Sequence, residues 1–142
     1  MKKSILKKLN KLYVLEIKNN NIDSFPEIIG SFKNLMYLSS SKNPLKKLPE
    51  SFGKLQSLKI LKLNYTSIDS LPNNFSALNQ LQTLEIQSNS ADTFFTKNAL
   101  KGLYNLKSLT IFKTNLKEFP LGMEKNKKLK NVVIVDCQLE NI

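Results

Sequence analysis

Few residues of the types that usually carry catalysis occur in this chain of 142 residues. Histidine is absent, Cys137 is the only cysteine, and eleven Asp and Glu residues are scattered along the sequence. Nucleophilic Ser–His or Cys–His pairs and Cys/His zinc sites are therefore excluded. Glu16 and Glu85 are expected on one face but three predicted strands, roughly 14 Å, apart. Glycosidase carboxylates lie closer, at roughly 5.5–9.5 Å.

Motifs for cofactors are missing as well, because no P-loop, GxGxxG, CxxC or acidic calcium loop occurs. We therefore expect no cofactor, no metal site and no enzymatic activity. Binding of a partner remains as the class of function that the chain can serve.

The charge of the chain comes from lysine alone. All 22 basic residues are lysine, and the formal net charge is +11. Arginine, whose planar fork reads guanine and clamps phosphate, is absent, so no specific nucleic-acid partner is expected. Weak binding to a polyanion or to an anionic membrane surface remains an alternative function. It would use lysine clusters near the two ends, at Lys2, Lys3, Lys7, Lys8 and Lys11 and at Lys125, Lys127, Lys128 and Lys130. An AT-rich coding sequence would also explain the excess.

The N-terminal segment does not resemble a signal peptide. Lys7, Lys8 and Lys11 interrupt every window that could form the apolar stretch of about 7–15 residues that a signal needs. No stretch approaches the roughly 20 apolar residues of a transmembrane helix. A cytoplasmic location is the default expectation, and one cysteine permits no intrachain disulfide.

A repeat organises the whole sequence. Leucines at positions 12, 35, 58, 81, 106 and 129 open six segments, spaced by 23, 23, 23, 25 and 23 residues. We therefore expect a single domain, 1–142. It divides into a partial repeat 1–11, repeats 12–34, 35–57, 58–80, 81–105 and 106–128, and a partial repeat 129–142.

Each segment carries the same local signals. Its LxL core alternates apolar and polar residues, which predicts a strand with one buried face. Prolines at 26, 49, 72 and 120 follow the strands in four units, so a long helix cannot form there. A single unit buries too little apolar surface to fold alone, and neighbouring units must stack around a shared core.

The repeated pattern resembles the leucine-rich repeat family, with the consensus LxxLxLxxNxLxxLPxxFxxLxx, over residues 6–142. The resemblance implies an α/β fold, a right-handed solenoid with a concave parallel β-sheet and a mostly irregular or short-helical convex side. Members of the family hold protein partners on the concave surface. They are often segments of larger signalling, adhesion or effector proteins, so a protein–protein interaction module is the leading functional hypothesis.

The ninth position of each unit has a structural role in this family. The resemblance implies a buried ladder whose side chains bond to backbone groups exposed by the turn after each strand. Its members here are Asn20, Asn43, Thr66, Asn89, Thr114 and Cys137. Cys137 is thus expected to be structural rather than reactive.

Two units depart from the pattern. The fourth has 25 residues and no proline, and Leu100 and Leu103 lie at helical spacing, which predicts a short helix over Thr96–Leu103. The second has Ser40 where a core Leu or Ile is expected. A void or a polar partner is expected there.

The predicted binding surface consists of the positions that alternate with the buried leucines, together with the residues that follow each strand. The candidate residues on this concave face are Val14, Glu16, Lys18, Tyr37, Ser39, Lys42, Ile60, Lys62, Asn64, Tyr65, Glu85, Gln87, Thr110, Phe112 and Lys113. Aromatic side chains dominate many interface energies, so Tyr37, Tyr65 and Phe112 are the expected anchors.

The last strand is expected to be apolar on both faces. Val133 and Val135 should face outward, whereas a missing neighbour should be faced by Val132, Ile134, Leu139 and Ile142. An open edge of this kind favours association, so self-association through the C-terminal edge is a further expectation.

Overall fold

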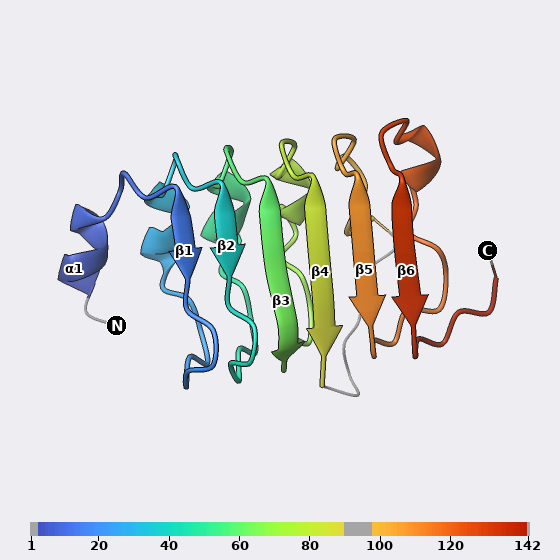
Figure 1. The fold of residues 1–142 in the computed structure, drawn as a ribbon, viewed down its shortest axis with the longest axis horizontal. Coiled ribbons are helices and arrows are strands. Elements are labelled where there is room, and N and C mark those ends of the chain that lie inside the picture. The colour runs from blue at the N-terminus through green and yellow to red at the C-terminus, as the bar shows by residue number, and fades with distance from the viewer. Residues whose placement is uncertain (1–2, 90–97, 142) are drawn as a thin grey trace.

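A computed structural model describes residues 3–89 and 98–141, in which six strands form one sheet (Figure 1). Each strand pairs in parallel with the strand of the next unit, in the order of the sequence. The strands are β1 (Val14–Glu16), β2 (Tyr37–Ser39), β3 (Ile60–Thr66), β4 (Thr83–Ser88), β5 (Ser108–Phe112) and β6 (Asn131–Val135). The predicted parallel sheet, one strand per repeat, is confirmed.

The opposite side of the molecule carries short helices, also as predicted. The 3-10 helices are η1 (Glu27–Ser31), η2 (Glu50–Lys54), η3 (Phe75–Ala77) and η4 (Met123–Lys125). Pro26 and Pro49 precede η1 and η2 with extended backbone, at φ −72° and −69°. Because proline fixes φ and lacks an N–H, it starts these turns but cannot sit inside a longer helix.

The core lies between the sheet and the short helices. The leucines that open the second to fifth units, and the first leucines of their strands, are fully buried. Phe25, Phe52 and Phe75 form a row behind them, with ring centroids 6.2 Å and 6.4 Å apart. This continuous row links three units, as expected for repeats that share one core.

Helix α1 (Lys3–Lys8) precedes the first strand and packs against η1. Leu6 is 1% exposed and continues the core, whereas Leu9 is 39% exposed. Of these two leucines of the partial repeat 1–11, Leu6 therefore contributes to the core and Leu9 does not. No helix in the described part of the chain is long and apolar enough to cross a membrane.

In the fourth unit, the observed structure differs from the short helix predicted over Thr96–Leu103. Residues 96 and 97 lie outside the described residues, and residues 98–102 form a turn. Gly102 has φ +99°, which ends any right-handed helical path at that point. Leu100 and Leu103 are nevertheless buried.

The hydroxyl of the core serine in the second unit has a hydrogen-bond partner. Ser40 is fully buried, and Asn43 Nδ2 lies 3.3 Å from Ser40 Oγ. The hydroxyl therefore accepts a hydrogen bond from the neighbouring ladder residue. Of the two expected outcomes, a void or a polar partner, the second is the one observed.

Candidate binding surface

The outward side of the six-stranded sheet, here called the sheet face, presents rows of side chains that cross the strands. One row runs from Val14 through Tyr37 and Ile60 to Thr83, and the pairing continues through β5 and β6. The next row on the same side begins with Glu16. Because parallel strands lie about 4.8 Å apart, residues in one row are immediate neighbours.

The sheet face is hollowed where the first four strands end. The depression has a volume of about 410 Å³. It is lined by residues of four successive units: Lys18, Asn19, Ser41, Lys42, Lys62, Asn64, Tyr65 and Glu85. Three lysines and one carboxylate make the lining net positive.

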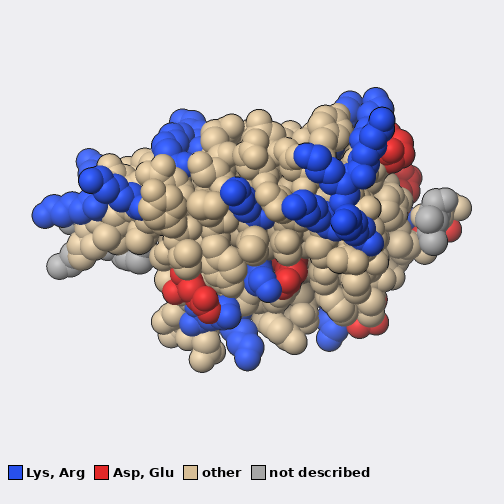
Figure 2. All heavy atoms as spheres, turned by 45° about the horizontal axis from the view of Figure 1, so that its top comes forward, with Lys and Arg blue, Asp and Glu red and all other residues tan. Residues whose placement is uncertain are grey.

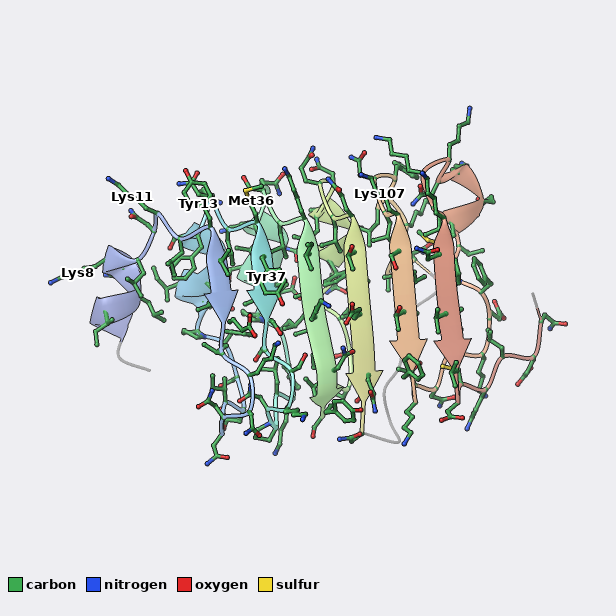
Figure 3. All side chains as sticks on the ribbon, viewed as in Figure 1. Lys8, Lys11, Tyr13, Met36, Tyr37 and Lys107 are labelled. Atoms are coloured by element: carbon green, nitrogen blue, oxygen red, sulfur yellow. The ribbon has the colours of Figure 1, made fainter. Side chains whose placement is uncertain are left out.

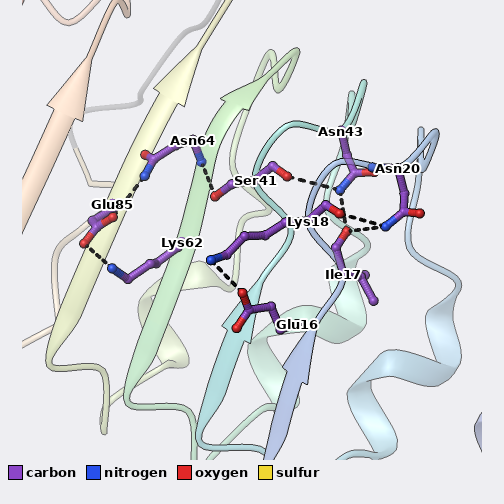
Figure 4. A network of polar contacts seen from close by, with 9 residues as sticks. All are labelled: Glu16, Ile17, Lys18, Asn20, Ser41, Asn43, Lys62, Asn64 and Glu85. Carbon is purple, nitrogen blue, oxygen red and sulfur yellow. Dashed lines mark hydrogen bonds and ion pairs between the residues drawn. The ribbon is translucent and has the colours of Figure 1, made fainter.

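A polar network fixes the floor of this depression (Figure 4). Lys62 forms an ion pair with Glu85 at 2.9 Å, and Asn64 Nδ2 donates to the same carboxylate at 2.9 Å. The backbone N–H of Asn64 donates to Ser41 Oγ at 3.2 Å. These bonds hold the side chains of β3 and β4 in one arrangement.

Lys18 forms the second ion pair of the sheet face. Its ammonium lies 2.6 Å from Glu16 Oε1, and both side chains come from the same segment of the chain (Figure 4). The hydrogen bond to Glu16, and then the charge of that carboxylate, raise the pKa of Lys18. Lys18 is therefore a cation throughout the neutral pH range.

The residue that precedes the ladder position adopts an unusual backbone conformation in five of the six units, near the end of the strand or within three residues after it. Asn19, Lys42, Tyr65, Lys113 and Asp136 have positive φ, between 51° and 58°. Only Asn and Asp enter this left-handed region readily, and other L-residues pay about 1–2 kcal/mol for it. Lys42, Tyr65 and Lys113 are thus held at the end of their strands by the surrounding fold.

The three predicted aromatic anchors differ in exposure. Tyr65 is 51% exposed, and the ammonium of Lys42 lies 6.0 Å from its ring centroid. Tyr37 and Phe112 are half-buried. Val14, at the first strand, is also exposed. Tyr65 is therefore the most accessible of the predicted anchors.

Ser39 does not belong to the accessible surface, contrary to expectation. Its side chain is fully buried, and its hydroxyl has no hydrogen-bond partner within the described structure. Ser39 lies in register between Glu16 and Lys62, whose longer side chains flank it. A small residue between longer neighbours is covered even on the outer face of a sheet.

Asn43 shows how the ladder position works. Its Oδ1 accepts from the backbone N–H groups of Asn20 and Ile22, each at 3.1 Å. Its Nδ2 donates to the carbonyl of Ile17 at 2.8 Å and to that of Ser40 at 3.1 Å. One buried amide therefore satisfies four backbone groups of two successive turns.

Thr66 and Thr114 are buried at the same position, and Cys137 is half-buried. Thr66 Oγ1 donates to the carbonyl of Leu63 at 3.2 Å. Thr114 Oγ1 and Cys137 Sγ lie 3.4 Å apart. Each is therefore engaged in local structure.

Two ladder residues are placed differently from the expectation. Asn20 is exposed, although its Nδ2 still donates to the carbonyls of Ile17 and Lys18 at 3.1 Å and 2.9 Å. Asn89 is exposed and Ser88 is buried in its place. Ser88 pairs with Thr66 after a shift in register, and its hydroxyl donates to the carbonyl of Ile68 at 2.8 Å.

The described residues hold no group of three or more His, Cys, Asp or Glu side chains that could bind a metal ion. Glu16 and Glu85 each pair with a lysine of their own. The geometry of the sheet face therefore offers aromatic, ammonium and amide groups for contact with a partner.

The stacked strand–turn–helix units and their buried polar ladder define a class, the parallel repeat solenoid. A family profile for the leucine-rich repeat region matches residues 2–142. The chain therefore belongs to the leucine-rich repeat family. A comparison with curated protein sequences found no match.

Solved structures resemble the chain over most of its length. A leucine-rich repeat protein of Leptospira interrogans is 32% identical, covering 84% of this chain and 30% of that one, with a TM-score of 0.76. An internalin from Listeria monocytogenes is 22% identical, covering 99% of this chain and 40% of its own, with a TM-score of 0.82. This chain thus spans less than half the length of either protein.

A plant protein shares the fold as well. The leucine-rich repeat ectodomain of a receptor kinase from Arabidopsis thaliana is 22% identical, covering 88% of this chain and 70% of that one, with a TM-score of 0.70. At this identity, as for the internalin, the likeness concerns the fold alone.

Proposed function

We propose that this chain is a protein–protein interaction module that binds its partner on the sheet face, and that it works by binding rather than by catalysis. The observation that carries the proposal is the exposed ring of Tyr65 at the rim of the depression. Aromatic side chains next to a preformed hollow are typical centres of binding energy. Family membership, and the fold shared with a receptor ectodomain and an internalin, support the same class of function.

The chemistry of the depression favours a particular kind of partner segment. Lys18 and Lys62 are paired with carboxylates, whereas the contact that Lys42 makes is with the ring of Tyr65. A partner carboxylate placed near Lys42 would gain a charge-assisted hydrogen bond. The best fit is therefore an acidic segment that also carries an apolar side chain to pack on Tyr65.

Selection from a displayed library of natural protein fragments tests this function. The dissociation constant of a selected fragment is then measured for the chain and for Tyr65→Asn. Asparagine tolerates the positive φ at this position, so the ring is removed without new backbone strain. We expect affinity to fall about tenfold or more, as for an interface hot spot.

Tyr104→Asn is the matched control, because Tyr104 is 46% exposed and lies outside the sheet face. It should leave the affinity within about twofold, as expected for a residue outside the interface. Fragments that lose affinity with Tyr104→Asn but not with Tyr65→Asn would show that another surface binds the partner.

A further inference from the structure

Lysines are distributed unevenly between the two edges of the sheet. The upstream edge comprises the segments that lead into the six strands: residues 8–14, 31–37, 54–60, 77–83, 102–108 and 125–131. These segments hold ten lysines and no Asp or Glu. The downstream edge comprises the described residues after the strands: 18–24, 41–47, 64–70, 87–89, 112–118 and 135–141. It holds six lysines and five Asp or Glu.

The upstream edge holds Lys8 and Lys11 of the N-terminal lysine cluster and all four lysines of the C-terminal cluster. Lys11 lies at one end of this edge and Lys130 at the other, about 24 Å apart on the spacing of six parallel strands. Lys33, Lys59 and Lys107 lie between them. Figure 2 turns this edge toward the viewer and shows lysines recurring along it, and Figure 3 labels Lys11 and Lys107 on it.

The charges of this edge are not neutralised within the described part of the chain. Lys33 Nζ donates to the carbonyl of Lys54 at 3.1 Å, and Lys128 Nζ donates to the side-chain oxygen of Asn105. Neither acceptor is a carboxylate. The two ion pairs of the described residues both lie on the sheet face.

Among the described residues, one carboxylate directly adjoins these segments in the sequence. Glu124, in η4, accepts a hydrogen bond from the backbone N–H of Gly122 at 2.9 Å. It lies next to four lysines of the last segment, at 125, 127, 128 and 130, so this end of the edge stays strongly positive.

The charge covers an area rather than a line. On the sheet side, a lysine immediately precedes each of the strands β3, β5 and β6, at Lys59, Lys107 and Lys130. Lys33, Lys54 and Lys125 belong to the helix side, at or after η1, η2 and η4. A planar anionic surface can approach both rows at once, whereas a single linear polyanion can follow only one.

Exposed tyrosines accompany these lysines. Tyr13 is 61% exposed and Tyr104 is 46% exposed, and both belong to the upstream edge; Figure 3 labels Tyr13 there. Tyrosine is enriched at the level of lipid headgroups, because its ring is apolar and its hydroxyl is polar. Lysine contributes attraction to anionic lipids without any base-specific readout.

We infer that the upstream edge docks on the surface of an anionic lipid membrane. In this orientation the strands run away from the lipid, so the sheet face remains open at the side. Binding of lipid by one edge and of a protein by the sheet face are thus compatible, and neither depends on the other.

Co-sedimentation with vesicles tests the inference. Phosphatidylcholine vesicles with about 30% phosphatidylserine should bind the chain, and the affinity should fall at least about tenfold without the anionic lipid. Raising salt from about 0.05 M to about 0.3 M should weaken binding, because screening shortens the range of the attraction. The triple variant Lys59→Gln, Lys107→Gln and Lys130→Gln should bind at least about tenfold more weakly.

A second triple variant carries the same change of net charge on the other side of the molecule. Lys46→Gln, Lys47→Gln and Lys117→Gln neutralise exposed lysines of the downstream edge. This variant should lose less than about threefold, because distant charges are screened. Circular dichroism verifies that both variants are folded.

Equal losses in the two variants would overturn the inference, because net charge alone would then explain binding. It would also be overturned if heparin or poly(U) bound the chain while phosphatidylserine vesicles did not. That result would assign the edge to a polyanion in solution.

Discussion

Asn43 and Asn89 occupy the same position in their sequence units, but only Asn43 lies inside the protein. Asn43 satisfies backbone groups on both sides of a turn, whereas Asn89 is exposed and its own N–H donates to the carbonyl of Thr66 at 2.7 Å. The same residue type therefore has very different energetic weight in two repeats.

Replacement of each asparagine by alanine measures that difference. Asn43→Ala should lower the free energy of unfolding by about 1–3 kcal/mol, because several buried backbone groups lose their partner. Asn89→Ala should change it by less than about 0.5 kcal/mol, as is usual at exposed positions. Urea denaturation of both variants checks this, and equal losses of stability would contradict the ladder geometry.

The sequence predicts most of the ladder but not the exchange in the fourth unit. The consensus places Asn89 at the ninth position, and nothing in the local residue types distinguishes it from Asn43. The length of the fourth unit, 25 residues, indicates that the chain follows a different path after the strand. The length does not indicate whether Asn89 or the adjacent Ser88 is the buried residue. The burial of Ser39 is not predictable from the alternating pattern, because it depends on the longer side chains beside it.

At the scale of elements, contact between successive 3-10 helices depends on glycine. A Cβ built on Gly53, in η2, would lie 2.5 Å from the backbone oxygen of Asn74 and 2.6 Å from its Cγ. A Cβ built on Gly30, in η1, would likewise lie 2.5 Å from the backbone oxygen of Ser51. Successive repeats therefore approach each other closely on the side opposite the sheet.

Gly53→Ala tests this close approach. Alanine usually stabilises a compatible position by about 0.4–1 kcal/mol, because it restricts the unfolded chain. The added methyl group collides with backbone here, and overpacking costs about 1–3 kcal/mol. We therefore expect a net loss of stability in thermal unfolding.

Gln80→Ala, at an exposed position, is the control and should change stability by less than about 0.5 kcal/mol. A melting temperature of Gly53→Ala equal to or above that of the original chain would contradict the close approach of successive repeats at this position.

The elements themselves follow from local sequence wherever the unit keeps its length of 23 residues. Period-two alternation predicts each strand, and proline predicts the short helices of the first two units. The short helix expected at 96–103 has weaker support, because it rests only on the spacing of Leu100 and Leu103 and on Thr96 as an N-cap. Leu100 reaches the core from a turn and Leu103 from the residue after that turn, so burial of the two leucines does not require a helix.

At the scale of the whole molecule, six copies of one pattern determine the architecture. A repeat unit needs its neighbours to bury its apolar side chains, so stacking is the single arrangement that serves all copies. The surfaces are less predictable, because they depend on side chains from different repeats. The depression around Tyr65 combines four units, and the lysines of the upstream edge come from five of its six segments.

The two ends of the solenoid are not equivalent in the described structure. At β1 the core is continued by Leu6 of α1, which is almost fully buried. At β6 the outward Val133 and Val135 are about two-fifths exposed, and Val132 of the core row is 42% exposed. An apolar strand with an unpaired edge is a template for pairing with another chain.

We therefore expect this chain to self-associate through β6 in a concentration-dependent way. Sedimentation velocity across the micromolar range should show the weight-average sedimentation coefficient rising with concentration. Val132→Lys should abolish the rise, because a charge at the open edge opposes pairing with a second copy. Val14→Lys, at the opposite edge strand, removes a valine that is 57% exposed and should leave the association intact. A constant monomeric coefficient for the original chain would refute the expectation, and equal behaviour of the two variants would place the contact elsewhere.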